Sequence, residues 1–354
     1  MSAPAIAFEN VDIIFGGGRT GVRSALALLD AGHGRAEIAR RTGAIVGVAG
    51  ANLDIPAGSI SVLMGLSGSG KSTLLRAANG LNTVVRGAVR VRHGEEVIDV
   101  ASCDRRTLRR LRTERVAMVF QQFGLLPWRT VRDNVGLGLE LRGTSKAERR
   151  RMVDEKLALV GLTDWGDRYA SELSGGMQQR VGLARAFATD PDILLMDEPF
   201  SALDPLIRTR LQDELLALQA TVRKTIVFVS HDLDEALKLG NTISILEDGL
   251  IVQTGTPADI VLRPANDYVA SFVSHMNPLN ALRGDSVMRA VNGDGGHDGP
   301  ALPSSAPLRD IVRACHVSGA SVRLMDGETL VGLCGPVEIM RALGQQRGDA
   351  RTGA

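Results

Sequence analysis

The stretch Gly65-Leu-Ser-Gly-Ser-Gly-Lys-Ser-Thr73 decides the fold of this chain. It matches the pattern G-x-x-x-x-G-K-S of a phosphate-binding loop in full. The run Ser61-Val-Leu-Met64 before it has the composition of a buried strand, and a helix is expected from about Lys71. Glycines let backbone N–H groups converge on anionic oxygens, and the helix start adds the positive end of its dipole. The loop therefore predicts an α/β core that binds a nucleotide.

Within this loop each polar side chain has an expected role. Lys71 is expected to reach the β- and γ-phosphates, and the Ser72 hydroxyl to bind Mg²⁺. A second Mg²⁺ contact is expected from an acid at the end of a buried strand, and Asp197 follows Ile193-Leu-Leu-Met196. Glu198 is the next residue and is expected to polarise a water in line with the γ-phosphate. The remaining residues of the predicted nucleotide cradle are Gly65, Ser67, Gly68, Ser69, Gly70 and Thr73.

The rest of the chain alternates strand-like and helix-like segments, as a parallel α/β core does. A first strand is expected over residues 5–15, an insertion with two helices over 19–50, and strands again from 51. A basic helix is expected over 104–115, a helical subdomain over about 121–190, and βα units over 192–220 and 224–240. Glycine and proline accumulate over 284–307, which predicts a flexible linker. We therefore expect a core over 1–283 and a small module over 308–354.

Composition limits the classes of function. Apolar residues make up 44% and charged residues 23% of the 354 residues, and the net charge is +1, so no global field favours nucleic acid. The basic segment 104–115 has no interleaved aromatic residues for base stacking and is interpreted as a solvated helix face. There is no apolar run of about 20 residues and no signal-peptide pattern. The three cysteines have no metal-type spacing. These features predict a cytoplasmic protein.

A second glycine-containing turn, Leu173-Ser-Gly-Gly-Met177, lies about a hundred residues after the first. It is similar to the signature motif of ABC transporter nucleotide-binding subunits, and the resemblance covers roughly residues 5–280. In that family two subunits pair head to tail, so that each signature helix faces the phosphate loop of its partner. The resemblance implies that Ser174, Gly175 and Gly176 contact the ATP bound by a second copy of this chain.

Other motifs occur in the order that this family has. Gln121 resembles the glutamine that approaches Mg²⁺ and senses the membrane partner, and His231 resembles the histidine that contacts the γ-phosphate. Ser201-Ala-Leu-Asp204 resembles the loop that crosses the dimer interface. Phe15 occupies the place of the aromatic residue that stacks on adenine. The resemblance thus implies an ATPase in which Glu198, His231 and Gln121 are catalytic and Ser72, Gln121 and Asp197 bind Mg²⁺.

The insertion, the blocks Met64–Thr73 and Asp197–Arg208, and Asn266-Asp-Tyr-Val269 resemble importers of quaternary amines such as choline or glycine betaine. This resemblance implies a permease and an extracytoplasmic substrate-binding protein as partners, with the chain on the inner face of the cell membrane. With 3% aromatic residues, the chain itself is not expected to hold the amine in an aromatic cage. Residues 308–343 resemble at most one CBS repeat, a regulatory unit that is paired in several relatives.

Three other functions compete with this interpretation. The first is a soluble ABC-type ATPase, which would need long coiled-coil insertions or a second core, and neither pattern is present. The second is an importer for another solute, such as proline, methionine, an alkyl sulfonate or another amino acid. The third is a nucleotide-binding regulator, against which Glu198 argues.

Overall fold

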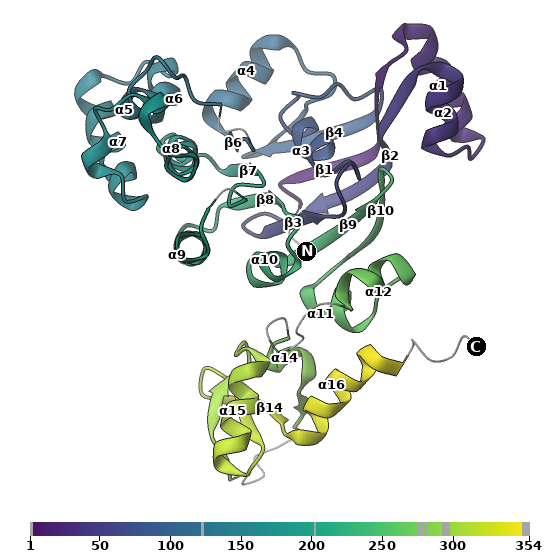
Figure 1. Ribbon diagram of the computed structural model, residues 1–354, viewed down its shortest axis with the longest axis vertical. Coiled ribbons are helices and arrows are strands. Elements are labelled where there is room, and N and C mark those ends of the chain that lie inside the picture. Colours follow the sequence, from purple (N-terminus) through teal and green to yellow (C-terminus); the bar gives the residue numbers. More distant parts are fainter. Residues whose placement is uncertain are drawn as a thin grey trace. The chain divides into compact units, whose positions relative to one another are not determined.

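A computed structural model describes residues 3–121, 124–201, 203–274, 279, 282–291 and 298–348. The chain divides into two compact units (Figure 1). The first comprises residues 1–231 and 246–251, and the second comprises residues 232–245 and 252–354. None of the described helices combines the length and the apolar character needed to cross a bilayer.

An antiparallel sheet forms one part of the first unit. Its strand order is β2-β1-β4-β5, and its strands are β1 (Ile6–Gly16), β2 (Ala44–Ile55), β4 (Arg86–His93) and β5 (Glu96–Asp99). Helices α1 (Gly18–Asp30) and α2 (Arg35–Thr42) lie between β1 and β2 in sequence and beside them in space (Figure 1). The second strand begins at Ala44 and not at the predicted position 51, because the chain pairs with β1 immediately after α2, with Phe15 opposite Ile45.

The second sheet carries the phosphate-binding loop. Its strand order is β10-β9-β3-β8-β7-β6, and its strands are β3 (Ile60–Met64), β6 (Val116–Val119), β7 (Ile193–Asp197), β8 (Thr225–Val229), β9 (Thr242–Glu247) and β10 (Leu250–Gly255). Strands β3, β8, β7 and β6 are parallel, which confirms the predicted parallel α/β core. The carboxyl ends of parallel strands share one edge of a sheet, where such folds bind ligands.

Between β3 and β8 the chain also forms a series of helices. The loop 65–70 leads into α3 (Lys71–Ala77), and the basic segment forms α4 (Arg105–Glu114), whose Leu111 is buried. The predicted helical subdomain contains α5 (Val131–Val135), α6 (Leu137–Leu141), α7 (Lys146–Leu159) and α8 (Gly175–Ala188), with short 3₁₀ turns at Thr163–Trp165 and Ala170–Glu172. Figure 1 shows α5 to α8 as one group, and α9 (Pro205–Val222) follows β7.

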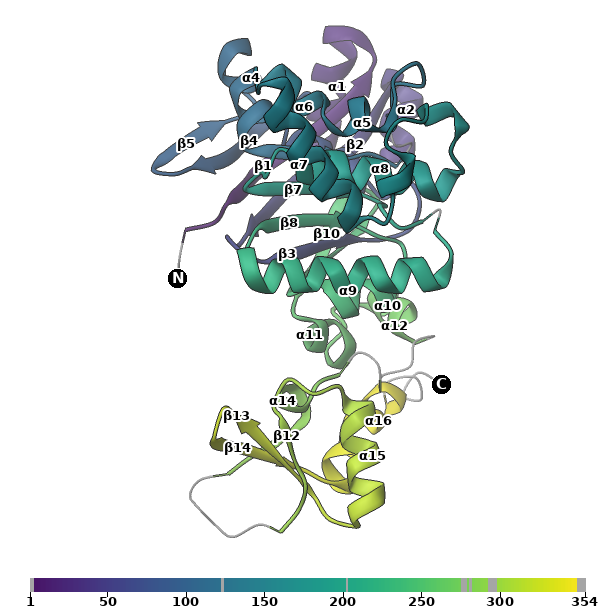
Figure 2. The same ribbon diagram turned by 90° about the vertical axis from the view of Figure 1, so that its left-hand side faces the viewer.

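The second unit contains α10 (Leu233–Leu239), α11 (Pro257–Leu262), α12 (Asp267–Val273) and α14 (Gly284–Val287). It also has a four-stranded sheet of order β11-β14-β13-β12, built from β11 (Arg289–Ala290), β12 (Ala301–Pro303), β13 (Val322–Asp326) and β14 (Thr329–Cys334). Helices α15 (Leu308–Ser318) and α16 (Pro336–Gly348) lie beside this sheet (Figure 2).

Near the end of the chain, β13, β14 and α16 follow one another as strand, strand and helix within the predicted module 308–354. Its interpretation as a CBS-like module stays a prediction, as does the linker at 284–307. Part of that linker, residues 292–297, lies outside the described residues, whereas α14, β11 and β12 fall within its bounds. Cys315 and Cys334 are buried in this unit, and burial raises the pKa of Cys334 to about 12, so this thiol is unreactive.

Candidate functional site

The phosphate-binding loop connects β3 to α3, as its sequence predicts. Gly70, which precedes α3, has a φ of 101°, and a Cβ there would lie 2.5 Å from the carbonyl oxygen of Gly47. Only glycine fits this position, because the backbone is left-handed and the adjacent strand is close. The loop therefore keeps its backbone N–H groups free of side chains at the start of α3, where an anion is stabilised.

Two polar groups in the loop are buried. The Lys71 ammonium donates hydrogen bonds to the carbonyl oxygens of Gly65 and Leu66, both at 2.8 Å, and the residue is 5% exposed. Burial lowers the pKa of Lys71, while the carboxylates of Glu198 and Asp197 oppose that shift. The hydroxyl of Ser69 is buried and has no hydrogen-bond partner among the described residues. An orphaned hydroxyl beside a buried cation fits a loop made to bind a polar, anionic ligand.

Asp197 lies at the end of β7 and is fully buried. Its Oδ1 accepts a hydrogen bond of 2.6 Å from the Ser72 hydroxyl, and its Oδ2 accepts one of 2.8 Å from Arg76. The structure thus brings together the two oxygens that the sequence assigns to Mg²⁺. Within the described residues there is no cluster of three or more metal-binding side chains. A hydroxyl and a carboxylate suit Mg²⁺, which takes few protein ligands and completes its shell with water and phosphate oxygens.

Glu198 lies one residue further along, with a left-handed φ of 47° that is uncommon for a residue with a side chain. Its Oε2 accepts a hydrogen bond of 3.2 Å from the Gln121 amide and lies 3.3 Å from Nδ1 of His231. Three residues predicted to be catalytic, from the ends of three strands, therefore meet at one carboxylate. Backbone strain of this kind is concentrated at functional sites.

Phe15 lies in a pocket of about 210 Å³ that opens beside the loop. The lining residues are Phe15, Arg35, Ile45, Gly47, Gly68, Gly70, Lys71, Ser72 and Thr73. A Cβ on Gly47 would lie 2.7 Å from a ring carbon of Phe15, so a side chain at this position would displace the ring. The pocket has an aromatic side at Phe15 and a cationic, N–H-rich side at the loop, a combination that suits a nucleotide.

The remaining predicted residues lie elsewhere. Ser174 caps α8 by accepting a hydrogen bond from the backbone of Met177, with Gly175 and Gly176 in the first turn. Asp204 caps α9 in the same way, through Ile207. None of these residues is among those that line the pocket. Ala202, in the same predicted loop as Asp204, lies outside the described residues, and Ser67 is exposed on the phosphate loop.

Sequence reasoning missed three residues at the site. Arg76 holds Asp197 from α3, Gln179 of α8 is buried and donates to the Glu198 carbonyl oxygen at 3.4 Å, and Arg35 lines the pocket. Arg76 lies five residues after Lys71, and this spacing places it on the helix that follows the phosphate-binding loop. The positions of Gln179 and Arg35 depend on how separate segments pack, for which the sequence has no local signal.

Comparisons with known proteins identify the family of this chain. Residues 48–201 match the family model described as ABC transporter. The chain is 50% identical over 264 residues to the glycine betaine/carnitine transport ATP-binding protein GbuA of Listeria monocytogenes, covering 75% of this chain and 66% of GbuA. It is 46% identical over 296 residues to the trimethylamine N-oxide transport ATP-binding protein TmoW of Ruegeria pomeroyi, covering 83% and 85% of the two chains.

A solved dimeric bacterial ABC transporter cassette, MJ0796, aligns with a TM-score of 0.60 at 31% identity, over 71% of this chain and 98% of that one. The fold is that of a P-loop nucleotide-binding protein, and the chain belongs to the ABC transporter ATP-binding family. The chain spans 61–66% of the length of the curated glycine betaine relatives that it matches.

Proposed function

We propose that this chain is the ATP-hydrolysing subunit of an importer for a quaternary ammonium compound, choline or glycine betaine. The observation that carries the chemistry is the meeting of Gln121 and His231 at the Glu198 carboxylate, beside the Ser72–Asp197 pair. The observation that supports the solute class is the naming of GbuA and its curated relatives for glycine betaine transport at 47–51% identity.

In the proposed reaction, ATP lies with its base at Phe15 and its phosphates in the loop. Lys71 leaves its loop carbonyls to bind the β- and γ-phosphates. Ser72 and Asp197 would hold Mg²⁺, which neutralises phosphate charge when bound. Glu198 accepts a proton from a water whose oxygen attacks the γ-phosphorus, and the bond to the β–γ bridging oxygen breaks to release ADP. Gln121 and His231, which contact Glu198, orient that water.

The proposed assembly is a head-to-tail pair of copies on a membrane permease. Ser174, Gly175 and Gly176 would complete the site of the partner copy, and Asp204 would lie near the pair's interface. The related cassette MJ0796 has been solved as a dimer, which supports this arrangement. The permease is expected to dock near residues 121–128, of which 122 and 123 lie outside the described residues and Trp128 is 70% exposed. A substrate-binding protein outside the membrane would deliver the amine, and the chain would lie on the cytoplasmic face.

The test is uptake of labelled glycine betaine, choline, trimethylamine N-oxide and proline by cells that lack this subunit. The cells are complemented with the native chain, with Glu198→Gln, or with Glu155→Gln as a matched control on the exposed surface of α7. We expect uptake of a quaternary amine with the native chain and the control, and at least about a 100-fold loss of ATP hydrolysis with Glu198→Gln.

Uptake of proline or trimethylamine N-oxide alone would contradict the quaternary-amine assignment and leave the ATPase assignment intact. Hydrolysis by purified Glu198→Gln at the native rate would contradict the proposed mechanism. Because the Glu155→Gln chain carries the same chemical change away from the site, it separates these effects from altered expression.

A further inference from the structure

The inserted helices reach the nucleotide pocket through one side chain, Arg35. This residue begins α2, and its guanidinium donates a hydrogen bond of 3.2 Å to the carbonyl oxygen of Gly68 in the phosphate loop. It lines the same pocket as Phe15 and Lys71. A segment that interrupts the β1–β2 hairpin therefore contributes a cation to the wall of the nucleotide site.

The insertion is packed firmly enough to place this cation. Ala25 of α1 and Ile38 of α2 are fully buried in an apolar cluster with Ile14, Val46 and neighbouring residues. Ile38 lies three residues after Arg35, so the turn of α2 that carries Arg35 is continuous with the packed turn. The start of α2 is therefore held against the sheet.

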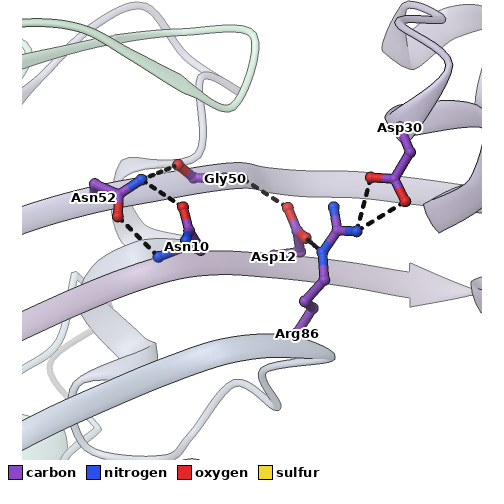
Figure 3. A network of polar contacts seen from close by, with 6 residues as sticks. All are labelled: Asn10, Asp12, Asp30, Gly50, Asn52 and Arg86. Carbon is purple, nitrogen blue, oxygen red and sulfur yellow. Dashed lines mark hydrogen bonds and ion pairs between the residues drawn. The ribbon is translucent and has the colours of Figure 1, made fainter.

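An ion-pair network around the buried Asp12 anchors the other helix (Figure 3). Arg86 of β4 binds Asp30, at the end of α1, through two hydrogen bonds of 2.7 and 2.9 Å, and it also binds Asp12 of β1. Asp12 is fully buried and accepts a further hydrogen bond of 2.6 Å from the backbone of Gly50. The carboxylates of Asp30 and Asp12 raise the pKa of Arg86, so the link keeps its charge. Asp30 lies five residues before Arg35 and fixes the end of α1 from which the chain enters α2.

The chemistry of the pocket indicates what Arg35 binds. Its guanidinium has N–H donors beyond the one that bonds to the Gly68 carbonyl oxygen. A carboxylate oxygen of Asp248 lies 3.8 Å from the same guanidinium, and that side chain is 87% exposed. A pair with so exposed a carboxylate contributes little. The residues that line the pocket include two cations, Lys71 and Arg35, and no carboxylate. A planar guanidinium with free donors beside a phosphate loop suits a phosphate oxygen.

We propose that Arg35 is a nucleotide-binding residue that contacts the phosphate chain of bound ATP, and that the insertion serves to place it. This inference rests on the nucleotide binding of the proposed function and adds to it a ligand contact from outside the shared core. The packing of the insertion holds Arg35 in the same place before and after hydrolysis, so we expect Arg35 to contact both ATP and ADP. It therefore lowers the KM for ATP and the Kd for ADP and leaves kcat nearly unchanged.

The experiment measures Mg·ADP affinity and steady-state ATP hydrolysis for the full-length chain. The variants are Arg35→Ala, Arg35→Lys, and Arg40→Ala, which removes an exposed arginine of the same helix that does not line the pocket. For Arg35→Ala we expect about a tenfold rise in both Kd and KM, the size of one charge-assisted hydrogen bond, with kcat within about twofold of native. Arg35→Lys retains the charge without the planar guanidinium, so we expect its Kd and KM to lie between those of the native chain and of Arg35→Ala. For Arg40→Ala we expect the native Kd and KM.

Two further measurements test the details. Competition by adenosine is expected to be equal for the native chain and Arg35→Ala, and an equal loss of adenosine and ADP affinity would overturn the phosphate contact. Asp30→Ala removes the anchor in Figure 3, so we expect a smaller rise in Kd, and no additional rise when it is combined with Arg35→Ala. Fully additive effects would overturn the role of the insertion in placing Arg35.

The possible failures are distinguishable. A native chain that does not bind Mg·ADP would overturn the proposed function together with this inference. A native chain that binds it, with Arg35→Ala folded and equal to native in Kd, would overturn this inference alone. A loss of kcat at unchanged Kd would also overturn it, because Arg35 would then act only on the shape of the loop through Gly68.

Discussion

The phosphate loop at 65–73 and the turn at 173–177 are two glycine-containing turns that each begin a helix, and their surroundings differ. The first is followed by α3 at an edge where Asp197, Glu198 and His231 converge, and its Ser69 hydroxyl is buried without a partner among the described residues. The second begins α8, and its Ser174 hydroxyl accepts a hydrogen bond from the same helix. The first turn lies beside two carboxylates and a histidine, whereas the second turn forms an ordinary helix N-cap.

This difference shows that a glycine turn and a helix start do not by themselves make a site. Parallel strands deliver an acid and a histidine to the first turn, because their carboxyl ends share an edge. The second turn acquires a comparable environment only if another chain supplies the phosphates. The proposed composite site made by two copies would supply such an environment, and the following predictions test it.

Removing the buried cation of the first turn is expected to have the largest effect. Lys71→Ala deletes the ammonium that the loop carbonyls hold, so ATP hydrolysis should fall by about 100-fold or more, because developing charge on the phosphates loses a preorganised donor. Hydrolysis by the purified full chain measures this. Lys224→Ala, which removes an amine that pairs with Asp190, is the control, and equal losses in the two variants would contradict the special role of Lys71.

A charge placed on the second turn is expected to act on the partner's site. A Cβ at Gly175 meets nothing within 4 Å, so Gly175→Asp is expected to fold, and its carboxylate would repel phosphates and reduce hydrolysis by about tenfold or more. Mixing Gly175→Asp with Lys71→Ala should restore about one quarter of native activity. If copies pair at random, half of the pairs contain one copy of each variant. Each such pair has one intact composite site of its two, formed by the Lys71 of one copy and the Gly175 of the other.

The mixing experiment distinguishes two arrangements of the site. If both turns served the nucleotide of their own chain, mixing the two inactive variants would restore nothing. That result would contradict the composite site, while the losses in the single variants would still stand.

The smallest expected effect is on stability. Ser174→Ala removes the cap of α8 and should cost about 1 kcal/mol, seen as a lower thermal midpoint, because one backbone N–H loses its acceptor. Asp104→Ala removes the equivalent cap of α4, which accepts from the backbone of Thr107 outside the predicted site, and is the matched control for this measurement. If Ser174 also contacts the partner's ATP, only Ser174→Ala should reduce hydrolysis beyond the loss explained by unfolding.

Residues that directly follow a strand were the most predictable parts of the site. The loop, Asp197 and Glu198 each follow a strand, so the sequence predicts their common edge, and the structure brings Ser72 to Asp197 and His231 to Glu198. The parallel core was predictable for the same reason, since apolar runs alternate with helical segments.

Other features depended on contacts that the sequence does not encode locally. The start of β2 at Ala44 follows from pairing with β1, whereas in the sequence two glycines interrupt the β-branched residues of the segment 44–50. Arg35 is one of several arginines in α2, and its distinction from Arg40 and Arg41 is the direction it faces after the helix packs. Gln179 reaches Glu198 only because α8 packs beside the residue that follows β7.

The left-handed backbone of Glu198 has a consequence for the engineering of this protein. Glutamate in that conformation costs about 1 kcal/mol or more, whereas asparagine adopts it more readily. A search for heat-resistant variants that ignores turnover would therefore tend to replace the very carboxylate proposed to activate water. At this position a substitution that raises thermal stability is expected to lower activity, so a selection for stability has to be combined with a selection for activity.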